Sequence, residues 1–269
     1  MPDGHAVSVA PPDPTVLSQL YLTAVLPCLA ELAAQDAQAR ELIGDTDASV
    51  VFRILGGTAV TVQLRRGVVA FQTGAAPRPS VVLLFLSHSH LNAFFSGEKW
   101  ALPILIWGAW HVRVLTRFTR LADRLKAVLD GDESVIASVE GRRLHARLSL
   151  MAAGLGLVPL SQGDDVTRIA LDAAPFGLAS FDIAGELCAT AWFEHAPNGC
   201  SAGWSEPPRR PEACITFCDV SIAFEAMRDQ IDTIAAVGRG QIIVDGLVPL
   251  AEELSFIMQR LRIYLQPVQ

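Results

Sequence analysis

The sequence predicts an α+β protein built from two similar units in tandem. Stretches of alternating hydrophobic and polar residues, typical of strands, are separated by stretches with helical periodicity. The order of these stretches recurs along the chain, and 269 residues are enough for two domains of ordinary size. Hydrophobic residues make up 51% of the chain and charged residues 18%, which requires a large core, an apolar interface or an apolar cavity.

The first half begins with a helical pattern from Thr15 to about Ile43, which Pro27 is expected to divide or kink. Alternating or continuous apolar runs then predict strands at 50–55, 60–65, 68–72, 81–86 and 109–114. Ser87 is placed to cap a helix between the fourth and fifth strands. A last helix is expected over 116–130, where Phe118, Leu121, Leu125 and Leu129 form one apolar stripe.

The second half repeats this order. Phe181 matches Phe52 and Gly199 matches Gly67, but the second pair is separated by three more positions than the first. Three extra residues are therefore expected in the hairpin loop around Pro197 and Asn198, since loops tolerate insertions. From Gly199 onward the separation stays constant, and the further matches are Pro79 with Pro211, Ser87 with Asp219, Gly108 with Gly240, Trp110 with Ile242, Val112 with Val244, Leu125 with Ile257 and Leu129 with Leu261.

The segment between the copies contains a predicted helix over 142–160, which stands where the first copy has its opening helix. Gly154, Gly156 and Pro159 are expected to end it. The predicted boundaries are 1–131 for the first unit, with its tail and opening helix, and 132–269 for the second unit, with its preceding helical segment.

The second copy carries the clearest family motif. Phe217-Cys218-Asp219 ends a strand and caps a helix. Ala235-Ala236-Val237-Gly238-Arg239-Gly240 then leads into the strand 241–246, and a final helix follows over 250–265. This arrangement resembles the sterol carrier protein type 2 family of lipid-binding domains, over residues 48–130 and 178–265. The first copy departs from the motif, with Val114 where the second copy has Gly246.

The resemblance implies that each unit is a mostly antiparallel five-stranded sheet with helices packed on one face. It also implies an apolar cavity that binds or transfers a fatty acyl, sterol-like or isoprenoid molecule without catalysis and without a cofactor. The second unit keeps the motif better and is the expected binder. The expected ligand-binding residues are Phe181, Ile183, Phe193, Phe224, Met227, Ile242, Val244 and Phe256.

Other classes of function find little support in the sequence. The net charge of −7 and the absence of a basic run argue against a nucleic-acid partner, and no segment predicts stable membrane insertion. The chain lacks a signal-like start, and its five cysteines form no close pair, so we expect a cytoplasmic protein with free thiols. Ser87-His88-Ser89-His90 opens a helix, where alternate residues diverge, so no metal site is expected.

Two alternatives remain open at this point. An enzyme or biosynthetic accessory protein would use the apolar pocket to isomerise, cyclise or present a hydrophobic intermediate, with His88, His111, Asp219 and Glu225 as the groups to examine. A protein with solid cores in both copies would act instead through protein contacts.

Overall fold

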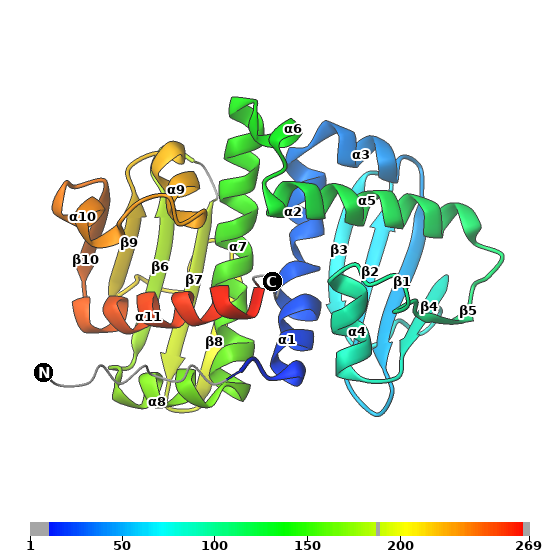
Figure 1. The fold of residues 1–269 in the computed structure, drawn as a ribbon, viewed down its shortest axis with the longest axis horizontal. Coiled ribbons are helices and arrows are strands. Elements are labelled where there is room, and N and C mark those ends of the chain that lie inside the picture. Colours follow the sequence, from blue (N-terminus) through cyan, green and yellow to red (C-terminus); the bar gives the residue numbers. More distant parts are fainter. Residues whose placement is uncertain (1–10, 187–188, 266–269) are drawn as a thin grey trace, which may run out of the picture.

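The structure is a computed structural model that describes residues 11–186 and 189–265. Its first half contains a long opening helix interrupted by one π-helical turn, a short helix, four strands, a helix, an edge strand and a long helix (Figure 1). These elements are α1 (Pro14–Leu20), the π turn η1 (Tyr21–Val25), α2 (Cys28–Gln35), α3 (Ala37–Ile43), β1 (Asp47–Ile54), β2 (Ala59–Arg65), β3 (Val68–Thr73), β4 (Val81–Phe85), α4 (His88–Phe95), β5 (Ile104–Trp107) and α5 (Val112–Asp130).

The second half has the same order with one added short helix, α10. After the connecting helix α6 (Glu133–Ile136), its elements are α7 (Val139–Gly163), α8 (Asp165–Ala173), β6 (Gly177–Ile183), β7 (Thr190–Ala196), β8 (Gly199–Trp204), β9 (Ala213–Phe217), α9 (Val220–Met227), α10 (Thr233–Gly238), β10 (Ile242–Gly246) and α11 (Val248–Leu265). The predicted caps are confirmed: Ser87 and Asp219 accept hydrogen bonds from backbone N–H groups in the first turns of α4 and α9.

The two sheets share one topology. Their strand orders are β3-β2-β1-β4-β5 and β8-β7-β6-β9-β10, and in each sheet the central pair is parallel while the others are antiparallel. The registers agree as well, because Phe52 pairs with Leu83 and the equivalent Phe181 pairs with Ile215. The predicted α+β class with two five-stranded, mostly antiparallel sheets is confirmed.

The structure corrects the position of the three extra residues. Both β2–β3 and β7–β8 are joined by two-residue turns, so nothing is inserted around Pro197 and Asn198. The extra residues lie instead between β6 and β7 and between β8 and β9, compared with the matching loops of the first unit. A two-residue turn fixes the register of a hairpin, whereas these longer connections do not.

The predicted fifth strand of the first unit was wrong. Residues 109–114 form a turn and the start of α5, and the edge strand is β5, at 104–107. Gly108 therefore corresponds to Gly246 rather than to Gly240: a Cβ atom at Gly108 would lie 2.1 Å from the Ser80 carbonyl oxygen, and one at Gly246 would lie 2.0 Å from that of Glu212. Both glycines let the chain leave the edge strand against the neighbouring backbone.

The final helices are aligned by an ion pair that occurs in both units. Arg124 of α5 lies 2.7 Å from Asp36, which caps α3, and Arg260 of α11 lies 2.8 Å from Asp164, which caps α8. With these pairs superposed, the predicted match of Leu125 with Ile257 was wrong by one helical turn. The matching buried residues are Phe118, Leu121, Leu125 and Val128 in α5 and Leu254, Ile257, Leu261 and Tyr264 in α11.

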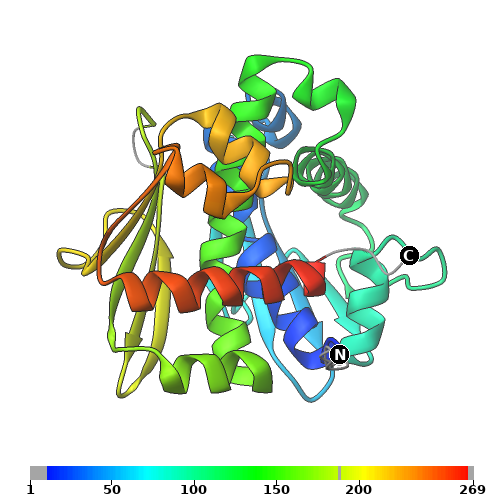
Figure 2. The same ribbon diagram turned by 60° about the vertical axis from the view of Figure 1, so that its left-hand side comes forward.

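The opening helices join the two units. In Figures 1 and 2, α1–α2 and α7 run side by side between the sheets, and they also pack against each other. Two helical stretches, 14–35 and 139–163, are long and apolar enough to cross a membrane by length and composition, but 56% and 72% of their most apolar windows is buried in the fold. Their position between the two sheets, where more than half of each window is buried, accounts for this hydrophobicity.

Helix α7 continues past the residues expected to end it. Gly154 lies so close to β7 that an added Cβ atom would be 2.6 Å from the Ala191 side chain, and one at Gly156 would be 3.0 Å from Leu261. These glycines therefore permit close packing inside the helix. Nearby, the buried Arg147 of α7 pairs with Glu31 of α2 at 2.5 Å and with Glu186 of the second unit at 3.2 Å, which links the units by charge as well as by packing.

Candidate ligand-binding site

Most of the residues predicted to bind a ligand lie in the core of the second unit. Phe181, Ile183, Phe193, Phe224 and Ile242 are buried in one hydrophobic cluster between the sheet and its helices. Met227 and Val244 are partly buried and pack against that cluster. Phe256 is the exception, because its position on α11 leaves its side chain 47% exposed.

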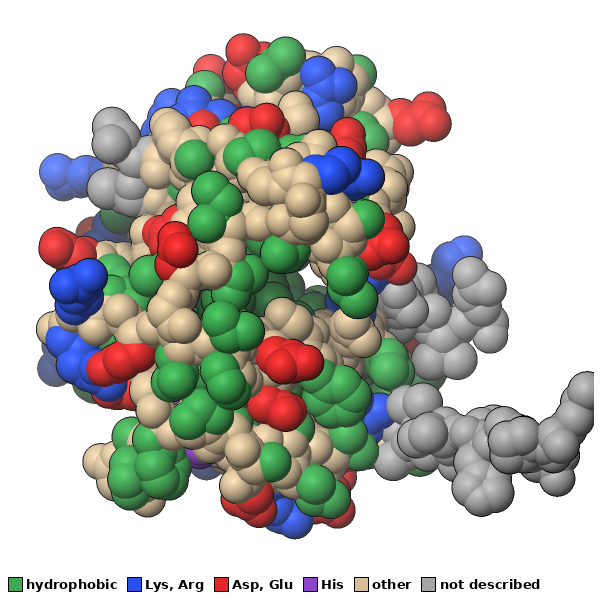
Figure 3. All heavy atoms as spheres, turned by 90° about the vertical axis from the view of Figure 1, so that its left-hand side faces the viewer, with side chains coloured by type: hydrophobic (Ala, Val, Ile, Leu, Met, Phe, Trp, Pro, Cys, Tyr) green, Lys and Arg blue, Asp and Glu red, His purple; other side chains and the backbone are tan. Residues whose placement is uncertain are grey.

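The apolar interior of this unit opens at the β10 edge. Figure 3 shows that this end of the molecule is hollowed between α10 and the start of α11, and that hydrophobic side chains line the hollow. Partly buried hydrophobic residues on the bordering elements include Met227, Ile231, Val244 and Met258, all of which pack against the core cluster. We call this depression the α10–α11 hollow.

A comparison of equivalent positions explains why the second unit is hollow here. In the first unit, Phe94 and Phe95 at the end of α4 pack edge to face, and Phe95 stacks on Tyr21 of the opening helix with ring centroids 4.7 Å apart and lies 6.2 Å from the buried Phe52. Counted from the capping residues of α4 and α9, the equivalent residues of α9 are Ala226 and Met227. An alanine and an unbranched, flexible methionine occupy less space than two phenylalanine rings.

An ion pair spans the gap between α9 and α11. Arg262 of α11 lies 2.7 Å from Asp229, which follows α9 and has a φ of 59° in the left-handed region. The hydrogen bond from Arg262 lowers the pKa of Asp229, so this carboxyl stays ionised under ordinary conditions. The Asp229 side chain is mostly exposed and that of Arg262 is partly buried, so the pair places charge between two helices of an otherwise apolar unit.

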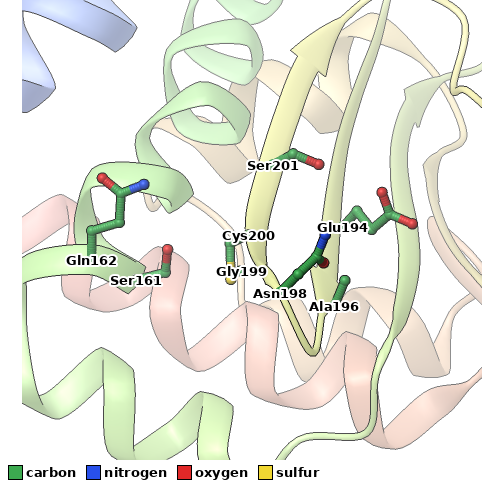
Figure 4. Close-up of a pocket in the computed structure, with 8 residues that line it drawn as sticks. All are labelled: Ser161, Gln162, Glu194, Ala196, Asn198, Gly199, Cys200 and Ser201. Carbon is green, nitrogen blue, oxygen red and sulfur yellow. The ribbon is translucent and has the colours of Figure 1, made fainter.

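A second, more polar hollow of about 370 Å³ lies beside the β7–β8 hairpin (Figure 4). None of the residues predicted from the sequence lines it. It is lined by Ser161, Gln162, Glu194, Ala196, Asn198, Gly199, Cys200 and Ser201. In Figure 4 these side chains come from the end of α7 and from the β7–β8 hairpin, and the titratable groups among the labelled side chains are Glu194 and Cys200.

Two of the four groups suspected for catalysis, His88 and Asp219, have structural hydrogen-bond partners. The Nδ1 atom of His88 lies 2.6 Å from the Ser18 hydroxyl, which itself donates to the Thr15 carbonyl oxygen, so the pair connects α4 to α1 with His88 as the donor. His90 contacts the Leu86 backbone N–H and the Leu102 carbonyl, and Asp219 caps α9. Among the described residues, no group of three or more His, Cys, Asp or Glu is placed to hold a metal ion.

Sequence reasoning missed the residues that shape the hollow by being small. Ala226 gave no signal on its own, but comparison with Phe94 at the matching position of the first unit would have revealed the loss of volume. Trp110 was matched with Ile242, which is buried, whereas Trp110 and the nearby Trp107 are both more than half exposed. The unmatched Val114 opposite Gly246 was the signal that the strand had been placed too late in the sequence.

Comparison with known proteins finds no matching family model and no matching curated protein. Among solved structures, the chain is similar to the solution structure of the sterol carrier protein domain 2 of Helicoverpa armigera. The sequences are 13% identical, the TM-score is 0.32, and the match covers 45% of this chain and 92% of that domain. The tandem arrangement of two units is shown by the chain's own two sheets.

Proposed function

We propose that the second unit binds an elongated apolar molecule, such as a fatty acyl, sterol-like or isoprenoid compound, through the α10–α11 hollow. The observation that carries this proposal is the replacement of the Phe94–Phe95 pair by Ala226 and Met227 beside a hollow lined with hydrophobic side chains. Such a ligand gains about 0.8 kcal/mol for each methylene group removed from water, so contact area is sufficient for binding.

An ion pair between α9 and α11 supports the orientation of an amphipathic ligand. Arg262 and Asp229 join the last turns of α11 to the segment after α9, whereas Met227 and Met258 belong to the partly buried apolar surroundings of the hollow. A ligand with an apolar chain and one polar end would place the chain against the core and its polar end at this solvent-accessible pair. Binding without chemistry is favoured over the enzyme alternative, because His88 and His111 belong to the first unit and Asp219 caps α9, which leaves Glu225 of α9 as the one suspected group of the second unit to test.

Phenylalanines placed at the positions of the second unit that match Phe94 and Phe95 should fill the hollow. We expect the double substitution Ala226→Phe and Met227→Phe to weaken binding of a fluorescent fatty acid about tenfold, since excluding two methylene groups costs about 1.6 kcal/mol. The measurement is a fluorescence titration of the full chain, with native mass spectrometry of protein purified from its own host to identify any retained lipid.

Ile234→Phe is the matched control, because Ile234 lies on α10 and is 84% exposed. It adds an aromatic ring outside the interior and should leave lipid affinity unchanged. If the core were solid, the double substitution would instead overpack it and lower the free energy of unfolding by about 1–3 kcal/mol. A marked loss of stability with unchanged lipid affinity would contradict the proposal.

A further inference from the structure

The edge strand of the first sheet exposes an unusual number of large apolar side chains. Each is between 42% and 71% exposed, and together they follow β5 and its flanking turns. We call this set the tryptophan edge: Trp100, Leu102, Ile104, Ile106, Trp107 and Trp110. Large apolar side chains that gather in this way on one exposed edge mark an interaction site.

Specific contacts hold these side chains at the surface. The rings of Trp107 and Trp110 meet edge to face with centroids 4.9 Å apart, and Trp100 stacks on His90 at 6.2 Å. Leu105 alone among the four strand residues packs against the core cluster, so Ile104 and Ile106 on either side of it point away from that core. These ring contacts therefore hold the exposed aromatic side chains in defined positions along the edge.

The charge beside this edge is opposite to that of the chain as a whole. Residues 96–120 carry four basic side chains, Lys99, Arg113, Arg117 and Arg120, against one acidic side chain, Glu98, although the chain has a net charge of −7. The equivalent segment of the second unit, 228–256, carries two basic and five acidic side chains. Lys99, Arg113 and Arg120 are exposed, while Arg117 is bound to Asp45.

In Figure 1, β5 and the first turns of α5 lie together at the outer edge of the first sheet. The buried stripe of α5, which includes Phe118 and Leu121, faces the core. Arg113, three residues after Trp110, and Arg120, two turns further along α5, are exposed to solvent on the same helix. An apolar aromatic surface is thus bordered by a local positive charge.

We propose that the tryptophan edge docks the first unit onto the surface of a membrane containing anionic lipids. Tryptophan is favoured at the boundary between lipid headgroups and acyl chains, because its ring is apolar and its N–H is polar. Arginine and lysine next to it are attracted to anionic headgroups. The contact is interfacial, and it is independent of ligand binding in the second unit.

A second copy of the chain fits this surface less well. A two-fold interface would place the tryptophan edge against itself and bring the basic side chains of both copies together. Such like-charge contact is unfavourable, whereas an anionic surface neutralises it. The basic side chains next to the tryptophan edge therefore favour an anionic membrane over a second copy of the chain as its partner.

Co-sedimentation with vesicles tests the proposal. We expect the full chain to bind vesicles of phosphatidylcholine and phosphatidylserine, to bind pure phosphatidylcholine weakly, and to lose affinity as salt is raised. Arg113→Gln with Arg120→Gln should weaken binding about fivefold for each charge removed. Trp107→Ser with Trp110→Ser should weaken it at least as much, and vesicle binding should shift the tryptophan emission of the unsubstituted chain to shorter wavelength.

Ile234→Ser with Phe256→Ser is the matched control, because both residues are exposed and apolar but belong to the second unit. It should bind vesicles as the unsubstituted chain does. Circular dichroism establishes that each variant folds, and the arginine variant tests the proposal without altering any apolar side chain. Failure of the chain to bind anionic vesicles, or a concentration-dependent dimer that the tryptophan substitutions abolish, would overturn the proposal; neither result bears on lipid binding in the α10–α11 hollow.

Discussion

Asp164→Asn is expected to lower the free energy of unfolding by about 3–5 kcal/mol, because it removes the anion from a buried ion pair. Asp164 is 4% exposed, and its carboxylate accepts hydrogen bonds from Arg260, Thr167 and Tyr264. The substitution leaves the guanidinium of Arg260 buried beside a neutral amide. Chemical denaturation with circular dichroism measures the effect, and thermal unfolding should fall by roughly 10 °C.

The neighbouring residue provides the control. Asp165 pairs with Arg168 at the surface, where the two side chains are 80% and 59% exposed, so Asp165→Asn should change stability by less than about 0.5 kcal/mol. Asp36→Asn changes the equivalent but less buried pair of the first unit, and its loss of unfolding free energy should lie between those of the Asp164 and Asp165 variants. Equal unfolding midpoints for the Asp164 and Asp165 variants would show that the buried pair does not stabilise the fold.

The same carboxyl gives a pH dependence of known sign. Burial raises the pKa of Asp164, but the hydrogen bonds from Arg260, Thr167 and Tyr264 outweigh it and lower the pKa to about 2. Because the folded value lies below the unfolded value of 3.8, the stabilisation is fully present above pH 4 and is lost as the pH falls towards 2. The stability of Asp164→Asn should therefore vary less over this range than that of the unsubstituted chain.

Gly246→Ala is expected to be the most disruptive single methyl addition in the second sheet, with a cost above about 4 kcal/mol. The new Cβ atom would lie 2.0 Å from the Glu212 carbonyl oxygen, and the backbone φ of 86° is itself unfavourable for alanine. Either β10 or the start of β9 must move. Loss of the cooperative unfolding transition, or a large shift of its midpoint, is the expected observation.

Gly240→Ala distinguishes the steric cost from the conformational one. Gly240 also has a positive φ, of 70°, but no atom lies within 4 Å of its added Cβ position. Gly240→Ala should lower the free energy of unfolding by about 1–2 kcal/mol. Gly108→Ala in the first unit should instead be as destabilising as Gly246→Ala. A Gly108 variant that behaves like the Gly240 variant would contradict the structural equivalence of Gly108 and Gly246.

The local sequence determined the α+β class, the repeated order of elements, and the caps at Ser87 and Asp219. These features depend on residues near one another in the chain: strand alternation has a period of two, and a cap lies within one turn of the helix that it stabilises. For the same reason, strands β1, β2, β3 and β4 were found near their observed positions, and the helical middle segment was correctly matched to the first opening helix.

Only the tertiary structure decided which glycines and leucines of the two units correspond, and which apolar residues face inward. Trp107, Trp110 and Phe256 have the same hydrophobicity whether they are buried or exposed, and their exposure depends on which neighbours cover them. The equivalence of Gly108 with Gly246 depends on the backbone carbonyl group that each approaches on the neighbouring segment. The alignment of α5 with α11 depends on the aspartate that pairs with each helix, which is distant in the sequence. The α10–α11 hollow likewise arises from volume absent at Ala226 and Met227, which no residue pattern within the second unit alone records.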